Sequence, residues 1–191
     1  DGSKVTLREL NRFENNYIEL GGKLYWDTLN MFYQMKQSIL AFKSESSGDL
    51  DAFGIDTWGV DYGLLDKNGV LLSNPRCYRD TGSEDVTAVH EVIPQKTLCG
   101  RTGIASMSFN TIYQLYKRKR EGDVALENAR TLLFTPDLLG YFFTGEKLSE
   151  YTISTTSALY DTIRKAWDRT TLAELGLPDI FTDVQSSGSL R

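Results

Sequence analysis

The stretch that decides the fold is residues 52–80, AFGIDTWGVDYGLLDKNGVLLSNPRCYRD. It opens with a short apolar run at residues 52–55 and then meets polar and aromatic side chains in immediate succession at residues 56–61, DTWGVD. Apolar residues resume at 62–65, and DKNG at 66–69 is typical of a hairpin turn, after which a second apolar run, VLL, follows. The pattern predicts a strand, a polar junction, a second strand, a turn and a third strand.

The polar junction at residues 56–61 requires an explanation. Burying a polar group without a partner costs roughly 1–3 kcal/mol. A ligand with many hydroxyl groups would supply partners, and so would side chains that pair with one another. The spacing alone leaves both explanations open.

Composition excludes several classes of protein. The chain has 191 residues, enough for one sizeable domain or two small ones, and a net charge of −5. The basic run KRKR at 117–120 is short and is followed by acidic residues. We expect it in the solvated last turn of a helix, where cations suit the helix dipole, and we expect no nucleic-acid partner. No apolar stretch approaches the ~20 residues that span a bilayer, so we expect no membrane partner.

The cysteine and histidine content points to a reduced, cytoplasmic protein without a zinc site. The two cysteines, Cys77 and Cys99, show neither metal-binding spacing nor a disulfide framework. The single histidine, His90, lies in a polar segment, where a surface position is the simplest explanation. Metal and Cys/His nucleophile chemistry are therefore not expected.

Helical and strand patterns flank the junction. Apolar residues at three- and four-residue spacing after Asp27, beginning with Leu29, predict an amphipathic helix to about Lys43 whose apolar stripe faces the core. Residues 129–134 read as a buried strand, and TPD at 135–137 is a strong helix start. Helices that feed buried strands predict an α/β layer architecture.

Three further segments carry predictions. Asn110 is expected to cap a helix whose apolar face includes Leu115. Because a helix N-terminus directs free N–H groups outward, Asn110 is a place for a ligand hydroxyl to dock, although a simple cap explains it as well. A short helix is expected over residues 95–99, ended by Gly100. SEYTISTTS at 149–157 is rich in hydroxyl groups and reads as a loop near a polar ligand or as a solvated connector.

A set of motifs, in this order and spacing, resembles the N-terminal domain of the FGGY family of carbohydrate kinases. The resemblance covers most of the chain. Within the family, the chain is most similar to the members that phosphorylate L-rhamnulose. The motifs are GIDTWGVDYGLLD (54–66), NPRCYRD (74–80), RTGI (101–104), FNTIYQLY (109–116), LLFTPDLLGYFFTG (132–145) and EYTISTTSALYD (150–161).

The resemblance implies an actin-like, ribonuclease-H-like α/β fold with a mixed sheet and flanking helices, in which two domains close on sugar and ATP. It implies transfer of the γ-phosphoryl group of Mg-ATP to the 1-hydroxyl of a ketose. A monomer is the default expectation. By similarity the substrate-binding residues are expected at the junction and near it: Trp58, Gly59, Asp61, Arg79, Asp80 and Asn110. Gly59 would let the sugar approach the backbone closely. Arg79 and Asp80 would pair with each other or with the junction carboxylates.

Three departures from the family pattern shape these expectations. The glycine-rich, Asp-bearing hairpin that handles ATP phosphates and Mg²⁺ is absent from residues 1–191, and the catalytic base and the nucleotide-binding domain are expected beyond Arg191. Gly82 and Ser83 stand where the family usually has an Arg-Thr pair. We therefore expect residues 1–191 to be most of the sugar-binding domain of a longer enzyme, with no catalytic base, no metal ligand and no ATP-binding residue of its own, and inactive alone.

Two alternatives stay open. One is a kinase of the same family for another ketose, such as L-fuculose or L-xylulose. The other is a non-catalytic sugar-binding module on the same fold.

Overall fold

The computed structural model describes residues 2, 4–46 and 48–189. Within this part of the chain the strands form four two-stranded ladders, β1–β2, β3–β4, β5–β8 and β6–β7. The elements in chain order are β1 (Tyr17–Leu20), β2 (Lys23–Trp26), α1 (Thr28–Glu45), β3 (Tyr62–Leu65), η1 (Tyr78–Asp80), α2 (Ser83–His90), α3 (Gln95–Thr102), α4 (Thr111–Arg120), α5 (Val124–Asn128), β4 (Thr131–Phe134), α6 (Thr135–Thr144), β5 (Ser149–Glu150), α7 (Tyr151–Thr155), β6 (Tyr160–Asp161), β7 (Ala166–Trp167), α8 (Arg169–Leu175) and β8 (Val184–Gln185).

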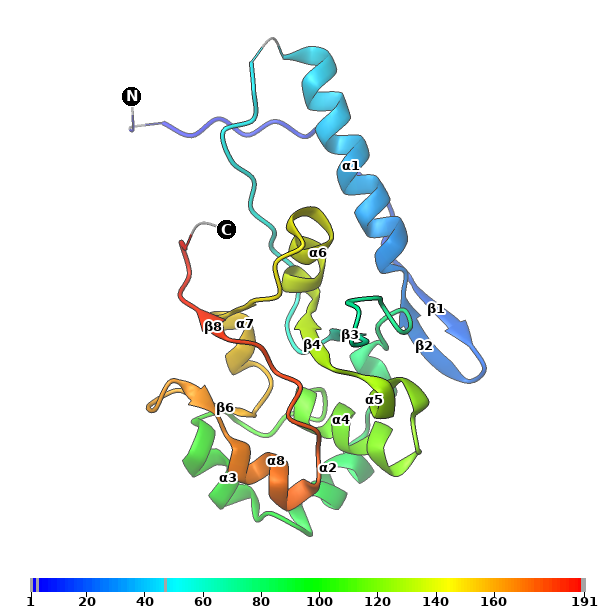
Figure 1. Cartoon of the computed structure of the whole chain (residues 1–191), viewed down its shortest axis with the longest axis vertical. Coiled ribbons are helices and arrows are strands. Elements are labelled where there is room, and N and C mark those ends of the chain that lie inside the picture. The colour runs from blue at the N-terminus through cyan, green and yellow to red at the C-terminus, as the bar shows by residue number, and fades with distance from the viewer. Residues whose placement is uncertain (1, 3, 47, 190–191) are drawn as a thin grey trace.

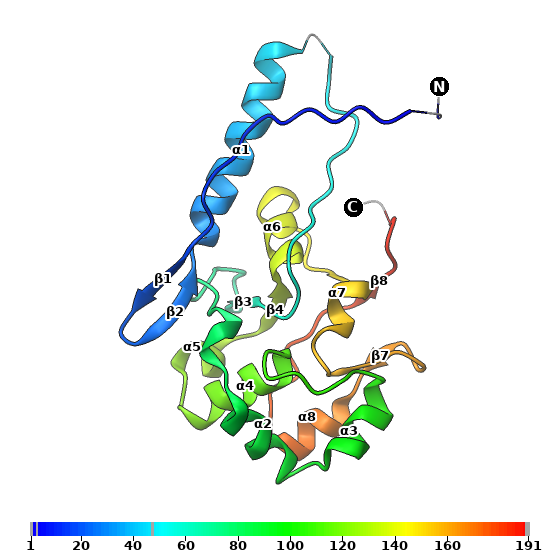
Figure 2. The same ribbon diagram turned by 180° about the vertical axis from the view of Figure 1, so that it is seen from behind.

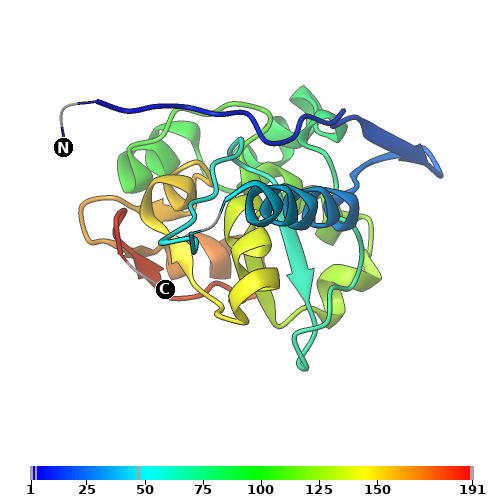
Figure 3. The same cartoon turned by 90° about the horizontal axis from the view of Figure 1, so that it is seen from above.

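Helix α1 and the β1–β2 hairpin flank the body of the molecule, as Figures 1 and 2 show from opposite sides. Strands β3 and β4 run through the middle with α6 above them, and helices α2, α3 and α8 gather at the lower end. Seen from above, α1 lies beside α6 (Figure 3). The ring of Phe32 on α1 meets those of Phe142 and Phe143 on α6 at centroid distances of 5.4 and 4.8 Å. The two helices are therefore joined by aromatic packing.

The ladder β3–β4 forms the buried centre of the fold. The strands are antiparallel, with Tyr62 opposite Phe134 and Leu65 opposite Thr131, and every residue of both strands is buried. The predicted strand at 129–134 and the predicted strand at 62–65 are thus confirmed. The DKNG turn is also present: the Asp66 carboxylate accepts the N–H groups of residues 68 and 70 at 2.8 and 2.9 Å.

The other two strands predicted in the deciding stretch are not formed as expected. The run at 70–72 contributes a single bridge, Leu71 to Leu65. The run at 52–55 is no strand, because it has no ladder partner among the described residues. Apolar alternation reports a preference for a pleated surface, whereas a strand also needs a neighbouring chain to pair its N–H and C=O groups.

Helix α1 begins where the sequence predicts. Asp27 caps it by accepting the N–H of Asn30 at 3.0 Å, and the helix continues two residues past Lys43. Its predicted core stripe is only partly right: Phe32 and Met35 are partly buried and pack against a hydrophobic cluster, but Leu29 is 59% exposed. The helix meets α6 through the ring of Phe32, whereas the side chain of Leu29 remains largely in solvent.

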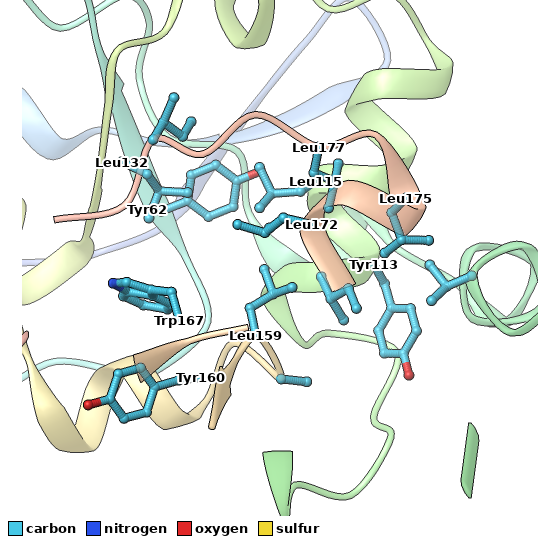
Figure 4. Close-up of a cluster of buried hydrophobic side chains, with 14 of the residues drawn as sticks. Tyr62, Tyr113, Leu115, Leu132, Leu159, Tyr160, Trp167, Leu172, Leu175 and Leu177 are labelled. Atoms are coloured by element: carbon cyan, nitrogen blue, oxygen red, sulfur yellow. The ribbon is translucent and has the colours of Figure 1, made fainter. Parts of the chain in front are cut away.

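One hydrophobic cluster holds most of the molecule together, and Figure 4 shows its centre. Side chains from β3, β4, α4, α8 and the β6–β7 ladder meet there. Its labelled members are Tyr62, Tyr113, Leu115, Leu132, Leu159, Tyr160, Trp167, Leu172, Leu175 and Leu177. The core therefore joins elements from both halves of the chain.

A smaller cluster lies where the β1–β2 hairpin meets α1 and α6. Trp26, Met31, Cys77 and Leu139 are buried in it, and Trp58 and Tyr78 pack against it. Cys77 is a free thiol, as is the exposed Cys99. This cluster supports the polar junction from one side.

Two predicted segments differ from the structure. Helix α3 continues through Gly100 and ends at Gly103, whose φ of 74° is the left-handed conformation that glycine favours. Residues 149–157 form β5 and the short helix α7 instead of a loop, and Ser149, Ser154 and Ser157 are buried. Hydroxyl groups that bond to the backbone of their own turn, as Ser154 does to Glu150 O at 2.7 Å, allow such a segment to pack inward.

Two polar side chains predicted at the surface are also more buried than expected. Arg118, in the basic last turn of α4, is only 3% exposed and pairs with Asp123 at 2.9 Å. His90 is half-buried, with its Nε2 3.1 Å from the Tyr113 hydroxyl. No helix in the described residues is long and apolar enough to cross a bilayer.

The buried position of Leu115 gives a stability prediction. Leu115→Ala should lower the free energy of unfolding by about 2–5 kcal/mol, because it removes apolar atoms from the main cluster and leaves a cavity. Leu29→Ala is the matched control: the side chain lies in solvent, so a change within about 0.5 kcal/mol is expected. Urea denaturation measures both variants. Equal losses in the two would place Leu115 outside the core.

Candidate sugar-binding site

The polar junction contains a strained three-residue turn. The Asp61 N–H donates to Gly59 O at 2.9 Å, and Val60 between them has a φ of 71°. These are the features of the rarer, strained form of the γ-turn. Positive φ is a true outlier for a β-branched residue and costs on the order of 1–3 kcal/mol. Such strain persists only where surrounding contacts hold it.

The contacts that hold the turn come from distant segments. Val60 N–H donates to the Thr156 hydroxyl at 3.0 Å. Val60 O accepts from the Thr111 hydroxyl at 2.8 Å and from the Gln114 amide at 3.1 Å. Helix α4 and the end of α7 therefore fix both backbone groups of Val60.

Asp61 follows the turn and is completely buried. Its Oδ2 accepts the indole N–H groups of Trp26 at 2.6 Å and Trp58 at 2.8 Å, and its Oδ1 accepts from Gln114 at 3.2 Å. Burial raises the pKa of the Asp61 carboxyl to about 6, although the three side-chain donors favour the charged form and limit the rise. With 0% of the residue exposed, Asp61 presents no atom to solvent, and its carboxylate is engaged by protein donors.

Trp58 is the aromatic side chain of the junction. It is half-buried, and its ring centroid lies 4.5 Å from that of Trp26. The bond to Asp61 fixes the orientation of the indole. An amphipathic ring held in this way is typical of small-molecule sites that combine an apolar surface with few polar groups.

Gly59 is required for a reason that the sequence did not reveal. A Cβ at this position would lie 2.9 Å from Thr156 Cγ2, closer than side chains approach one another. The glycine therefore allows Thr156 to lie directly against the turn. Close approach of a sugar to Gly59 stays a prediction.

Asn110 precedes α4, as the sequence predicted, but its side chain does not cap the helix. It accepts the Met107 N–H at 2.8 Å and donates to Thr156 O at 2.9 Å, and only 4% of the residue is exposed. Asn110 thus connects the loop before α4 to the end of α7. Its amide is already engaged with the protein.

Arg79 and Asp80 do not pair with each other or with Asp61 in the described structure. Arg79 is exposed and its guanidinium lies 5.1 Å from the centroid of the Tyr78 ring. Asp80 accepts the N–H of Leu24 at 3.0 Å, and its backbone oxygen accepts from Lys117. The predicted ion pair is wrong because the two side chains leave η1 in different directions, one toward solvent and one toward β2.

Sequence reasoning did not identify four residues that build this site: Trp26, Gln114, Tyr78 and Thr156. Gln114 alone connects three segments, since it also donates to Phe109 O at 2.9 Å. Tyr78 and Phe109 meet edge to face at 6.0 Å and add aromatic surface beside the junction. Tyr78 and Gln114 lie within the quoted motifs, which was a usable signal, whereas nothing local marks Trp26.

A groove of about 760 Å³ opens beside the junction. One wall is the extended segment 50–57, which includes Asp56 and Thr57, and the other is built by α6, α7 and residues 185–189. Neither Trp58 nor Asp61 lines it. The described residues hold no group of three His, Cys, Asp or Glu side chains able to bind a metal ion.

Comparison with solved structures defines the class of fold. Glycerol kinase of Plasmodium falciparum matches with a TM-score of 0.79 at 16% identity, over 94% of this chain and 38% of that one. Xylulose kinase of Lactobacillus acidophilus matches with a TM-score of 0.78 at 15% identity, over 90% of this chain and 36% of that one. The fold is therefore the actin-like fold of sugar kinases, as the sequence predicted.

Sequence relatives define the family. A family model for the N-terminal domain of the FGGY family of carbohydrate kinases matches residues 12–190. Rhamnulokinase of Bacteroides thetaiotaomicron is 38% identical over 178 residues, which cover 92% of this chain. Rhamnulokinase of Halalkalibacterium halodurans is 37% identical over 196 residues, which cover 98%. The chain belongs to the FGGY family of carbohydrate kinases, and it spans only 36–41% of the length of these two relatives.

The raised pKa of Asp61 makes stability depend on pH with a defined sign. The folded protein binds the Asp61 proton more tightly than the unfolded chain does, because the pKa of this carboxyl is near 3.8 in the unfolded chain. The stabilisation from proton uptake is complete below about pH 4 and is lost as the pH rises through about 6.

We therefore expect the stability of the wild type, relative to Asp61→Asn, to fall by up to about 3 kcal/mol between pH 4 and pH 7, since one pKa unit is about 1.4 kcal/mol. Urea denaturation at pH 4, 5, 6 and 7 measures this difference. A difference that does not change with pH would show that the carboxyl titrates near its ordinary value.

Proposed function

We propose that the full-length protein transfers the γ-phosphoryl group of ATP to the 1-hydroxyl of L-rhamnulose, and that residues 1–191 supply most of its sugar-binding surface. The observation that carries this proposal is the junction at residues 58–61, where a strained turn lies beside a buried carboxylate that accepts hydrogen bonds from two indoles. The relatives named rhamnulokinase support the choice of sugar. We infer that the protein is cytoplasmic and monomeric.

The junction is suited to a polyhydroxylated ligand in a simple way. Trp58 offers a ring held by Asp61, while Tyr78 and Phe109 extend the aromatic surface. The apolar C–H face of a sugar can lie on such rings while its hydroxyl groups bond to neighbouring polar groups. The strain at Val60 is consistent with a turn maintained for binding and not for stability.

ATP and Mg²⁺ belong to the proposed reaction, but the residues that would hold them are not identified in this part of the chain. Among the described residues no metal-binding cluster exists. Phosphoryl transfer depends on positioning and on charge stabilisation by metal and cationic groups. We therefore assign residues 1–191 the task of binding and orienting the sugar.

The substrate is tested by a coupled ADP-release assay on the full-length protein with L-rhamnulose, L-fuculose, L-xylulose, D-xylulose and glycerol. The highest kcat/KM with L-rhamnulose is expected. Preference for L-fuculose or L-xylulose would move the assignment to another ketose. A folded protein inactive on all five sugars would support a non-catalytic sugar-binding module instead.

Trp58→Phe tests the role of the junction. The variant keeps an aromatic ring but loses the N–H bond to the Asp61 carboxylate, so the ring is no longer oriented. A hydrogen bond to a charged group is worth about 1.5–3 kcal/mol, so we expect the KM for the sugar to rise about tenfold or more, with the KM for ATP unchanged.

Trp167→Phe is the matched control for this variant. It also removes one indole hydrogen bond, to Thr182 O, but in the main core. Its sugar KM should stay at the wild-type value. A similar rise in both variants would indicate a general loss of stability and remove Trp58 from the site.

A further inference from the structure

The conformation of the γ-turn at residues 59–61 depends on contacts from outside the turn. Positive φ is disfavoured for valine, so the turn would relax if its backbone groups were released. Among the described residues, one bond restrains the Val60 N–H: the bond to the Thr156 hydroxyl at 3.0 Å, from a residue 96 positions away in the chain. The shape of the turn therefore depends on the end of α7.

Thr156 restrains the turn in two ways. Its hydroxyl accepts the Val60 N–H, and its methyl group fills the space in which a side chain of residue 59 would lie. The hydroxyl fixes the direction of the peptide, and the methyl group limits how far the turn can move toward α7. Both contacts come from a single side chain.

Thr156 is itself held in place. Its hydroxyl donates to Ile153 O at 2.7 Å, which selects one side-chain rotamer. Its backbone oxygen accepts from Asn110, whose own oxygen accepts the Met107 N–H. The contacts of Thr156 therefore join three segments: the turn, the loop before α4 and the end of α7.

We propose that Thr156 is a positioning residue for sugar binding, which holds the Gly59–Val60 turn in the shape that presents Trp58 and the neighbouring backbone to the sugar. This proposal rests on the proposed function for its consequence in catalysis. Thr156 contacts the turn and need not touch the sugar. Its loss should weaken sugar binding without affecting ATP.

The first test compares Thr156→Val with Thr156→Ser in the full-length protein. Valine keeps the size of the side chain and removes the acceptor for the Val60 N–H, so the KM for the ketose should rise about tenfold while the KM for ATP stays the same. Serine keeps the hydroxyl, so its sugar KM should stay within about threefold of the wild type. Thr155→Val is the matched control, because the Thr155 hydroxyl donates to Thr152 O within α7 and bonds to no other group in the described part of the chain.

The second test measures the turn directly and does not require activity. Hydrogen-exchange mass spectrometry of peptides that contain Val60 should show faster amide exchange in Thr156→Val than in the wild type, Thr156→Ser or Thr155→Val. If the wild type binds no ketose, the proposed function fails, and the exchange rates still decide whether Thr156 holds the turn.

A second-site variant separates the methyl group from the hydroxyl. Gly59→Ala introduces a Cβ that meets the Thr156 methyl group, so it should raise the sugar KM. Adding Thr156→Ser removes that methyl group and should restore part of the binding. Wild-type sugar KM and exchange in Thr156→Val would overturn the proposal, as would equal rises in the KM values for sugar and ATP.

Discussion

The buried carboxylate of Asp61 is the interaction on which the site depends. A charge removed from water must be paired or hydrogen-bonded, and here two indoles and an amide supply the donors. The donors come from β2, the junction and α4, so satisfying one carboxylate brings three segments together. Asp61 O also accepts from Thr135, both N–H and hydroxyl, and this ties the start of α6 to the same residue.

The surrounding structure excludes solvent from Asp61 and holds the turn beside it in its strained conformation. The cluster around Trp26 and Cys77 closes one side, and the main core closes the other through Tyr62, the residue after Asp61. A salt-bridge network that includes Arg76, Glu121 and Asp123 holds the segment before η1 against the end of α4. The shape of the junction is therefore a property of the whole domain and not of the motif alone.

Local features were predictable from the sequence, and contacts between distant residues were not. The Asp27 cap and the start of α6 follow from residues within one turn of each other, and they were predicted correctly. The strand at 52–55 failed because pairing depends on a second segment. The motifs located the junction, but the burial of Asp61 depends on Trp26, 35 residues earlier, and the need for Gly59 depends on Thr156.

The buried position of Cys77 makes its chemical modification a measure of how often this part of the domain opens. Burial raises the pKa of this thiol to about 11, so almost none of it is the reactive thiolate at neutral pH, whereas Cys99 is exposed. Thiol reagents should therefore modify Cys99 at once and reach Cys77 only when the cluster around Trp26 separates. The modification rate of the exposed Cys99 therefore serves as a reference, and the slower modification rate of the buried Cys77 reports how often the cluster opens.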